Sequence, residues 1–309
     1  MKIAVLDLGT NTFHLLIVNV KSDGSFKKIF KSKIAVKLGE GSINEKIIAE
    51  IPFQRGINAL KHYSEILAGY RPEKIVAYAT SAIRSAKNGK KFIAAVKKKT
   101  GLSVQIISGA KEAELIYYGV RGSINMSDEK QLIMDIGGGS TEFIIANRNK
   151  IFWKKSFDIG ASRLLDRFKP SDPIKSTEIK KLESYLSKIL VPVDKALKKF
   201  PVRSLVGSSG SFDTFAEMIG WKYYRKDVLK NTETYFFNMK EYISLYKMLL
   251  ESTTAERMKM KGLIKMRVDM IVLAAICTTL VLRKYNLKEM YVSKSALKEG
   301  ALLKALEEL

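Results

Sequence analysis

Two stretches of the sequence combine an aspartate with glycines and hydroxyl side chains, which are residue types that bind phosphate and divalent cations. In the first, Asp7 follows an apolar run and precedes Gly9; in the second, Asp135 follows an apolar run and precedes three consecutive glycines. Glycines leave backbone N–H groups uncovered, so a phosphate can approach them directly. An aspartate at the end of the strand could hold a hydrated divalent cation beside that phosphate. For either stretch alone, a hairpin that binds no ligand is the alternative.

The two stretches form a repeat. Asp7 matches Asp135 and Gly9 matches Gly137, with an offset of 128 residues in both cases. Apolar, β-branched runs flank each turn, which predicts two strands joined as a hairpin. The repeat therefore predicts two similar halves, each opening with a phosphate-facing hairpin, and a ligand bound between them.

One cation follows a predicted buried strand at residues 75–79. Thr80 and Ser81 are expected to cap a helix after this strand, which places Arg84 in the first helical turn. A cation there opposes the helix dipole, so Arg84 suits an anion bound at the end of the strand. A surface arginine without a partner is the alternative.

One carboxylate lies on the apolar face of a predicted helix that Ser108 caps. Glu112 shares that face with Leu115 and Ile116, at positions i+3 and i+4, whereas Glu114 is expected to point towards Tyr118 and Arg121. Burial raises the pKa of a carboxylate and favours a general-base role for Glu112. Complementing the helix N-terminus is the alternative.

Later elements complete the expected framework. A strand at residues 204–206, a glycine-rich turn at 207–211 and a helix at 212–218 form a third potential anion site. Residues 122–130 are a candidate hinge, residues 176–199 a long helix, and residues 293–306 a terminal helix. Five cations between residues 257 and 267 form either a solvated face or a track for an extended polyanion.

The composition is that of a globular protein with excess positive charge. The 309 residues are 46% hydrophobic, and the formal net charge of +23 favours polyanionic partners. No signature of a specific nucleic-acid-binding motif accompanies this charge. One cysteine and two histidines exclude an ordinary zinc site, and Cys277 is expected to be buried. The longest apolar run, residues 270–282, is shorter than the roughly 20 residues of a membrane span, and no signal-peptide core follows Met1, so we expect a cytoplasmic protein without a membrane partner.

In this order, the motifs resemble those of the actin, sugar-kinase and heat-shock-chaperone ATPase superfamily. Within it, the sequence closely resembles the exopolyphosphatase and guanosine-pentaphosphate phosphohydrolase (Ppx/GppA) family. The resemblance rests on residues 7–14, 80–84, 108–109, 112–113, 135–142, 207–210 and 296–300. It implies two ribonuclease-H-like (actin-like) α/β domains with mixed central sheets, at residues 1–124 and 125–309, and an active site in the cleft between them. The C-terminal helix, about residues 295–309, is expected to pack back on the first domain.

The resemblance also implies roles for individual residues. Glu112 corresponds to the catalytic glutamate that activates water, Arg84 to an arginine that contacts the phosphoryl group, and Glu142 to a second active-site acid associated with water or metal. Asp7 and Asp135, with Glu142, would hold Mg²⁺ (or Mn²⁺). The phosphate-binding positions are Thr10, Asn11, Thr12, Gly137, Gly138, Gly139, Ser140, Thr141, Gly207, Ser208, Ser209 and Gly210.

The sequence departs from the family pattern at three positions. Glu114 and Lys298 stand where arginine is usual, and Ser208 stands where alanine is common. Longer members carry a C-terminal HD-type domain that extends the substrate channel, and the expected short form lacks it, which bears on processivity.

The expected function is Mg-dependent release of terminal orthophosphate from inorganic polyphosphate, from guanosine pentaphosphate (pppGpp), or from both. A homodimer is expected. Two alternatives remain at this point: an ATP-dependent kinase of the same superfamily, and a non-catalytic sensor of polyphosphate or an alarmone. Turnover with phosphoryl transfer to an acceptor would reveal the kinase, and tight binding without turnover the sensor.

Overall fold

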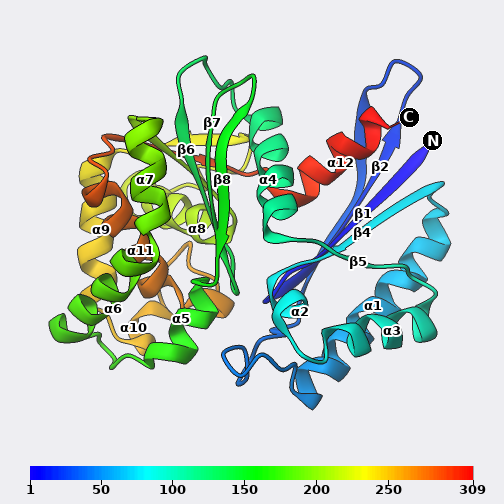
Figure 1. Ribbon diagram of the computed structural model, residues 1–309, viewed down its shortest axis with the longest axis horizontal. Helices are drawn as coiled ribbons and strands as arrows, with labels where there is room; N and C mark the ends of the chain where they lie inside the picture. Colours follow the sequence, from blue (N-terminus) through cyan, green and yellow to red (C-terminus); the bar gives the residue numbers. More distant parts are fainter. Residues whose placement is uncertain (309) are drawn as a thin grey trace.

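The computed structural model, which describes residues 1–308, consists of two α/β halves that lie side by side (Figure 1). The sheet of the first half has the strand order β3-β2-β1-β4-β5. Its strands are β1 (Lys2–Leu8), β2 (Thr12–Val20), β3 (Phe26–Ala35), β4 (Lys74–Ala79) and β5 (Gln105–Ile106). The first three strands pair antiparallel, whereas β4 and β5 continue the sheet in parallel with β1. β1 and β2 are apolar on both faces because helices cover both.

Helices cover the two faces of this sheet through separate cores. α1 (Glu50–Tyr70) and α3 (Gly89–Thr100) pack on the face that carries Leu6 and Leu15. α4 (Gly109–Ser123) and α12 (Leu297–Glu307) pack on the opposite face, which carries Val5 and Leu16. α4 also contacts β7 (Thr141–Ala146) and β8 (Ile151–Phe157) of the second half, so it lies between the two sheets (Figure 1).

The chain returns to the first half at its C-terminal end. α12 packs against α4 and β1, and both chain ends lie on this half of the molecule (Figure 1). The two helices meet at glycines: a Cβ at Gly300 would lie 1.7 Å from the carbonyl oxygen of Leu115, and one at Gly119 would lie 2.0 Å from that of Ala296. Only glycine permits this approach of the two helix backbones.

The second sheet repeats the first. Its strand order is β10-β11-β9-β6-β7-β8, with β6 (Gln131–Ile136), β9 (Ser204–Ser208), β10 (Thr234–Phe236) and β11 (Glu289–Ser293). β6, β7 and β8 pair antiparallel as β1, β2 and β3 do, and β9 and β11 continue in parallel as β4 and β5 do. The repeat and the predicted α/β fold class of two similar halves are therefore confirmed. β10 is an additional antiparallel strand at the edge.

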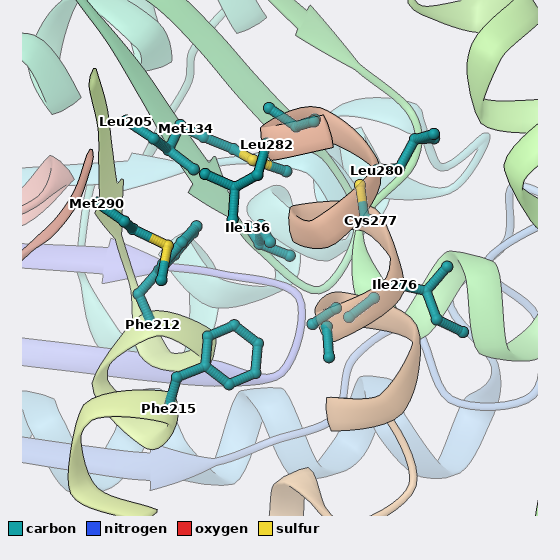
Figure 2. Packing of buried hydrophobic residues seen from close by; sticks show 14 of the residues in the cluster. Met134, Ile136, Leu205, Phe212, Phe215, Ile276, Cys277, Leu280, Leu282 and Met290 are labelled. Carbon is teal, nitrogen blue, oxygen red and sulfur yellow. The ribbon is translucent and has the colours of Figure 1, made fainter. Parts of the chain in front are cut away.

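The second half has the larger helical layer. It comprises α5 (Ala161–Phe168), α6 (Ser176–Ile189), α7 (Val191–Lys199), α8 (Gly210–Ile219), α9 (Met239–Glu251), α10 (Thr254–Arg257) and α11 (Ile271–Lys284), with a π-helical turn η1 (Gly220–Tyr224) and a 3₁₀ turn η2 (Lys265–Arg267). Cys277 lies on α11 among apolar side chains that include Ile136 and Leu282 (Figure 2). It is buried and free, as expected, and burial raises the pKa of its thiol to about 12. Within residues 1–308, no helix combines the length and apolar character that crossing a bilayer requires.

Three predictions about local structure were wrong. The long helix expected at residues 176–199 is divided at Leu190 into α6 and α7, because Pro192 cannot continue a helix but fits the first turn of a new one. The terminal helix, expected to begin at residue 293, begins at Leu297, because Ser293 still belongs to β11. The side chain of Thr80 makes no capping hydrogen bond to α2 (Ser81–Ser85).

Candidate active site

A cavity of about 190 Å³ lies between the two halves, where the two glycine-containing hairpins meet. Both turns contain the same hydrogen bond, from Gly9 N to Thr12 O at 3.1 Å and from Gly137 N to Ser140 O at 3.0 Å. The cavity is also lined by parts of α4, α8 and the first turn of α12. A cavity therefore lies between the two halves, where the repeat predicted a bound ligand.

The two turns touch each other, and this contact explains the glycines. A Cβ at Gly138 would lie 2.7 Å from Nδ2 of Asn11, and a Cβ at Gly139 would lie 2.6 Å from Oγ1 of Thr10. Arg163 joins the two halves at this contact. Its Nε donates to Gly139 O at 2.9 Å and its Nη1 to Ile43 O at 3.0 Å. The second and third glycines are thus required for the approach of the two halves, in addition to any phosphate they bind.

Glu112 projects from the first turn of α4 onto the cavity and is 7% exposed. Ser108 caps the helix by accepting a hydrogen bond from Lys111 N at 3.1 Å. Nη1 of Arg84 donates to Oε2 of Glu112 at 2.5 Å and to Ile107 O at 3.3 Å. Burial raises the pKa of Glu112 above its usual value, and the Arg84 guanidinium opposes that rise. Arg84 therefore contacts the cavity through Glu112 and is not part of the cavity wall.

Two aspartates face the same cavity from the two hairpins. Asp135 accepts hydrogen bonds from Ser209 Oγ, 2.7 Å from each carboxylate oxygen, and from Ser208 Oγ. Burial raises the pKa of Asp135, while these two hydroxyls oppose the rise. Burial also raises the pKa of Asp7 to about 7; Lys298 opposes that rise and the charge of Glu112 adds to it. Two hard oxygen ligands in one cleft fit a Mg²⁺ ion that keeps waters and binds substrate phosphate.

Glu142 is buried behind this wall. It pairs with Asp135 across β6 and β7, and its Oε1 accepts a hydrogen bond from Ser156 Oγ at 2.6 Å. Burial raises its pKa well above the usual value, and the charges of Glu112 and Asp135 add to the rise. Glu142 does not line the cavity, and among residues 1–308 no group of three acidic, histidine or cysteine side chains has metal-binding geometry. The three predicted metal ligands thus do not come together as one cluster, which leaves Asp7 and Asp135.

The other predicted phosphate-binding residues divide into two groups. On the cavity wall lie Thr10, Asn11, Thr12, Gly137, Gly138, Gly139, Ser140, Ser209 and Gly210. Thr141, Gly207 and Ser208 are not among the residues that line it. Thr141 donates to Ile159 O, and Gly207 and Ser208 belong to β9, where a Cβ at Gly207 would lie 2.0 Å from the ring of Phe212. Gly207 is therefore required for packing.

Four cationic side chains on the cavity wall were missed as site residues. They are Lys33, Arg267, Lys294 and Lys298, and they surround Asp213. Their charges lower the pKa of Asp213 against a larger rise caused by burial. The cavity wall therefore carries carboxylates and cations together, and the charge of Lys298 acts on Asp7 and Asp135 as well as on Asp213. Individual lysines and arginines give no local signal of this kind, since only the fold brings them together.

His14 was also missed, although the repeat contains the signal. It lies 128 residues before Glu142 and pairs with Asp7 as Glu142 pairs with Asp135. Its Nε2 is 2.9 Å from Thr12 Oγ1, while its buried Nδ1 has no partner among residues 1–308. Ser81 Oγ and Asp213 Oδ1 also have no hydrogen-bond partner among residues 1–308, and His14, Ser81 and Asp213 all line the cavity. Because buried polar groups are normally paired, these atoms indicate a polar ligand.

Two other expectations concern charged residues. Glu114 pairs with Lys111 at 2.8 Å and Lys154 at 2.9 Å and is not among the residues that line the cavity, so it points away from Glu112 as expected. The cations at 257–267 do not form one face, because Arg257 is buried in an ion pair with Asp172 at 3.0 Å while Arg267 lines the cavity.

The raised pKa of Asp7 predicts a pH-dependent stability. With a pKa of about 7 in the folded chain and about 3.9 when unfolded, Asp7 contributes fully below pH 4, and its contribution is lost as pH rises through 7. Asp7→Asn should raise the melting temperature of the metal-free protein by roughly 2 to 4 °C near pH 8 and have little effect near pH 4, where the aspartate is protonated in both states. Thermal melts in a chelator at both pH values measure this. An equal shift at both values contradicts the prediction.

Comparisons with known proteins agree with the fold described above. The model of the Ppx/GppA phosphatase family matches residues 16–309. The crystal structure of an exopolyphosphatase from Cytophaga hutchinsonii superposes with a TM-score of 0.96 at 39% sequence identity, covering 100% of this chain and 99% of that one. The crystal structure of the Aquifex aeolicus member of the Ppx/GppA family gives a TM-score of 0.82 at 26% identity, covering 100% of this chain and 98% of that one.

Proposed function

The chain belongs to the Ppx/GppA phosphatase family, and we propose that it is an exopolyphosphatase that releases terminal orthophosphate from inorganic polyphosphate. The observation that carries this proposal is Glu112, a buried carboxylate held by Arg84 on the wall of a cavity that two aspartate–glycine turns also line. A kinase needs a base for an acceptor hydroxyl, and a sensor needs none. A buried glutamate with a raised pKa beside phosphate-binding turns suits the activation of water.

The reaction assigned to this geometry is a direct displacement at phosphorus. The N–H groups of the two turns bind the terminal phosphoryl oxygens. Glu112 accepts a proton from a water molecule while the oxygen of that water attacks the terminal phosphorus. The bond from that phosphorus to the bridging oxygen breaks, and this oxygen leaves with the shortened chain, whose charge the cations on the cavity wall stabilise. Arg84 orients Glu112 through their hydrogen bond.

Mg²⁺ is the proposed cofactor, held by Asp7 and Asp135 from the two hairpins. When bound, it would polarise the phosphoryl oxygens and offset the negative charge that develops on them. The two serines that donate to Asp135 orient its carboxylate. Glu142 accepts a hydrogen bond from Ser156 and lies beside Asp135 in the sheet, so its proposed role is to support Asp135. A homodimer and a cytoplasmic location stay predictions from the sequence.

The proposed function is tested by a panel of phosphate-release assays. Polyphosphates of several lengths, pppGpp and ATP are compared with Mg²⁺ and with a chelator. We expect orthophosphate from polyphosphate, none from ATP at a comparable rate, and loss of activity in the chelator. Phosphate transfer from ATP to an acceptor would indicate a kinase, and tight binding of polyphosphate without turnover would indicate a sensor. A higher kcat/KM for pppGpp than for any polyphosphate would make pppGpp the principal substrate.

A further inference from the structure

We propose that three lysines on β3 bind the part of the polyphosphate chain that extends beyond the scissile bond. These residues, Lys33, Lys31 and Lys28, are named the β3 lysine row. The inference rests on the proposed function and specifies how the enzyme holds its substrate.

The register of β3 against β2 places the three lysines on one face. Lys33 pairs with His14, Lys31 with Leu16 and Lys28 with Val18. Alternate residues of a strand share a face, so His14, Leu16 and Val18 point to the same side of the sheet, as do the lysines opposite them. The regular alternation alone would place Ile29 on this face. A β-bulge between Ile17 and Val18 skips Ile29 and brings Lys28 onto it.

The row leads from the cavity to the surface. Lys33 lines the cavity, where Lys298 and Arg267 lie near it. Lys31 follows on the exposed part of the strand, and Lys28 lies 3.9 Å from Glu233 of the other half. At about 3.3 Å per residue, the row spans roughly 15 Å. A linear polyanion whose end lies in the cavity can therefore continue along it.

Two of the three lysines in the row have no ion-pair partner among the described residues, and Lys28 pairs with Glu233 at 3.9 Å. Among residues 1–308, Lys31 and Lys33 form no ion pair with a carboxylate. Partial burial and the charge of Arg267 lower the pKa of Lys33 to about 8, although the charges of Asp213 and Glu217 oppose this shift. Partial burial also lowers the pKa of Lys31. The charges of Lys298 and Lys28 add to this shift, and that of Glu299 opposes it. Cations that repel one another and open onto a cleft bind an anion favourably.

The alternative is that these lysines only protect an open sheet edge. β3 is an edge strand, and lysines on such strands prevent pairing with other chains. Lys27 distinguishes the two explanations. It is exposed on the same strand but pairs with Asn19, so it points to the opposite face. If the lysines only protect the edge, Lys27 is equivalent to its neighbours. If they bind substrate, Lys27 does not take part because it lies on the other face.

The test compares a double variant, Lys28→Gln with Lys31→Gln, with the control Lys27→Gln. The readout is the ratio of KM for long-chain polyphosphate to KM for tripolyphosphate, because only the longer chain reaches past Lys33. We expect the double variant to raise this ratio about tenfold at low salt, and to reduce the dependence of log KM on log salt by about one per lysine. Lys27→Gln should leave the ratio within about twofold of wild type.

The outcomes separate this inference from the function on which it rests. If wild type hydrolyses both substrates and the double variant keeps the wild-type KM ratio, the β3 lysine row does not bind the chain, and the proposed function stands. An equal rise in the ratio for Lys27→Gln also overturns the row, because bulk charge then explains the effect. If wild type hydrolyses neither substrate, the proposed function and the row both fail. Circular dichroism and thermal melts check that each variant is folded.

Discussion

Replacing Glu112 by glutamine is expected to reduce kcat for phosphate release by about 10² to 10⁴-fold, the usual contribution of a positioned general base. Glutamine keeps the size of the side chain but cannot accept the proton of the attacking water. Glu112 is buried on the cavity wall and held by Arg84, so its loss removes chemistry rather than substrate contacts. Binding of polyphosphate should therefore persist. The measurements are steady-state phosphate release and equilibrium binding of a fluorescent polyphosphate.

The same helix provides a matched control. Glu114 lies two residues further along α4 and pairs with Lys111 and Lys154 outside the cavity. Glu114→Gln removes the same charge, and partly exposed ion pairs contribute only about 0 to 1 kcal/mol. Its kcat should stay within about twofold of wild type. If Glu112→Gln releases phosphate at the wild-type rate, Glu112 is not the general base. An equal loss of kcat in both variants would instead indicate an effect of the net charge of α4.

Replacing Gly300 by alanine is expected to destabilise the protein and reduce its activity together. The new Cβ would lie 1.7 Å from the carbonyl oxygen of Leu115, one turn after Glu112 on α4. Because the alanine Cβ would meet a backbone oxygen, which cannot rotate away as a side chain can, α12 and α4 must separate. Overpacking of this kind costs about 1 to 3 kcal/mol or more. A displacement of Glu112 by about 1 Å would reduce kcat by about 10²-fold. Thermal melts and phosphate release measure the two effects.

A second helical glycine provides the control for this variant. Gly69, near the end of α1, has no heavy atom within 4 Å of the position of a Cβ. Gly69→Ala should be neutral or stabilise by up to about 1 kcal/mol, because alanine favours the helix. Activity should be unchanged. A Gly300→Ala protein that melts with wild type would show that α12 does not depend on this close approach.

Much of the fold follows from local patterns in the sequence. The apolar, β-branched runs around Asp7 and Asp135 specify the paired hairpins, since β-branched residues pack well on a pleated surface and glycines permit the turns. The 128-residue repeat predicted two similar sheets, and the strand orders confirm them. The capping serine and the apolar face of the helix beginning at Gly109 predicted the burial of Glu112. These features depend on neighbours within a few residues, so periodicity and turn chemistry suffice.

The rest of the site depends on contacts between residues far apart in the chain. Arg84 meets Glu112 only because β4 and β5 lie side by side, and α2 and α4 begin at their ends. The sequence motif suggested Gly207 and Ser208 as a phosphate turn, but sheet pairing extends β9 through both.

By itself, the sequence determined the two hairpins, the buried glutamate and the family. Only the tertiary structure decided which cations share the cavity and that a bulge in β3 places Lys28 on the same face of the sheet as Lys33. The physical reason is that a charged side chain carries no periodic signal of its own, and its partners are fixed by how separate elements pack.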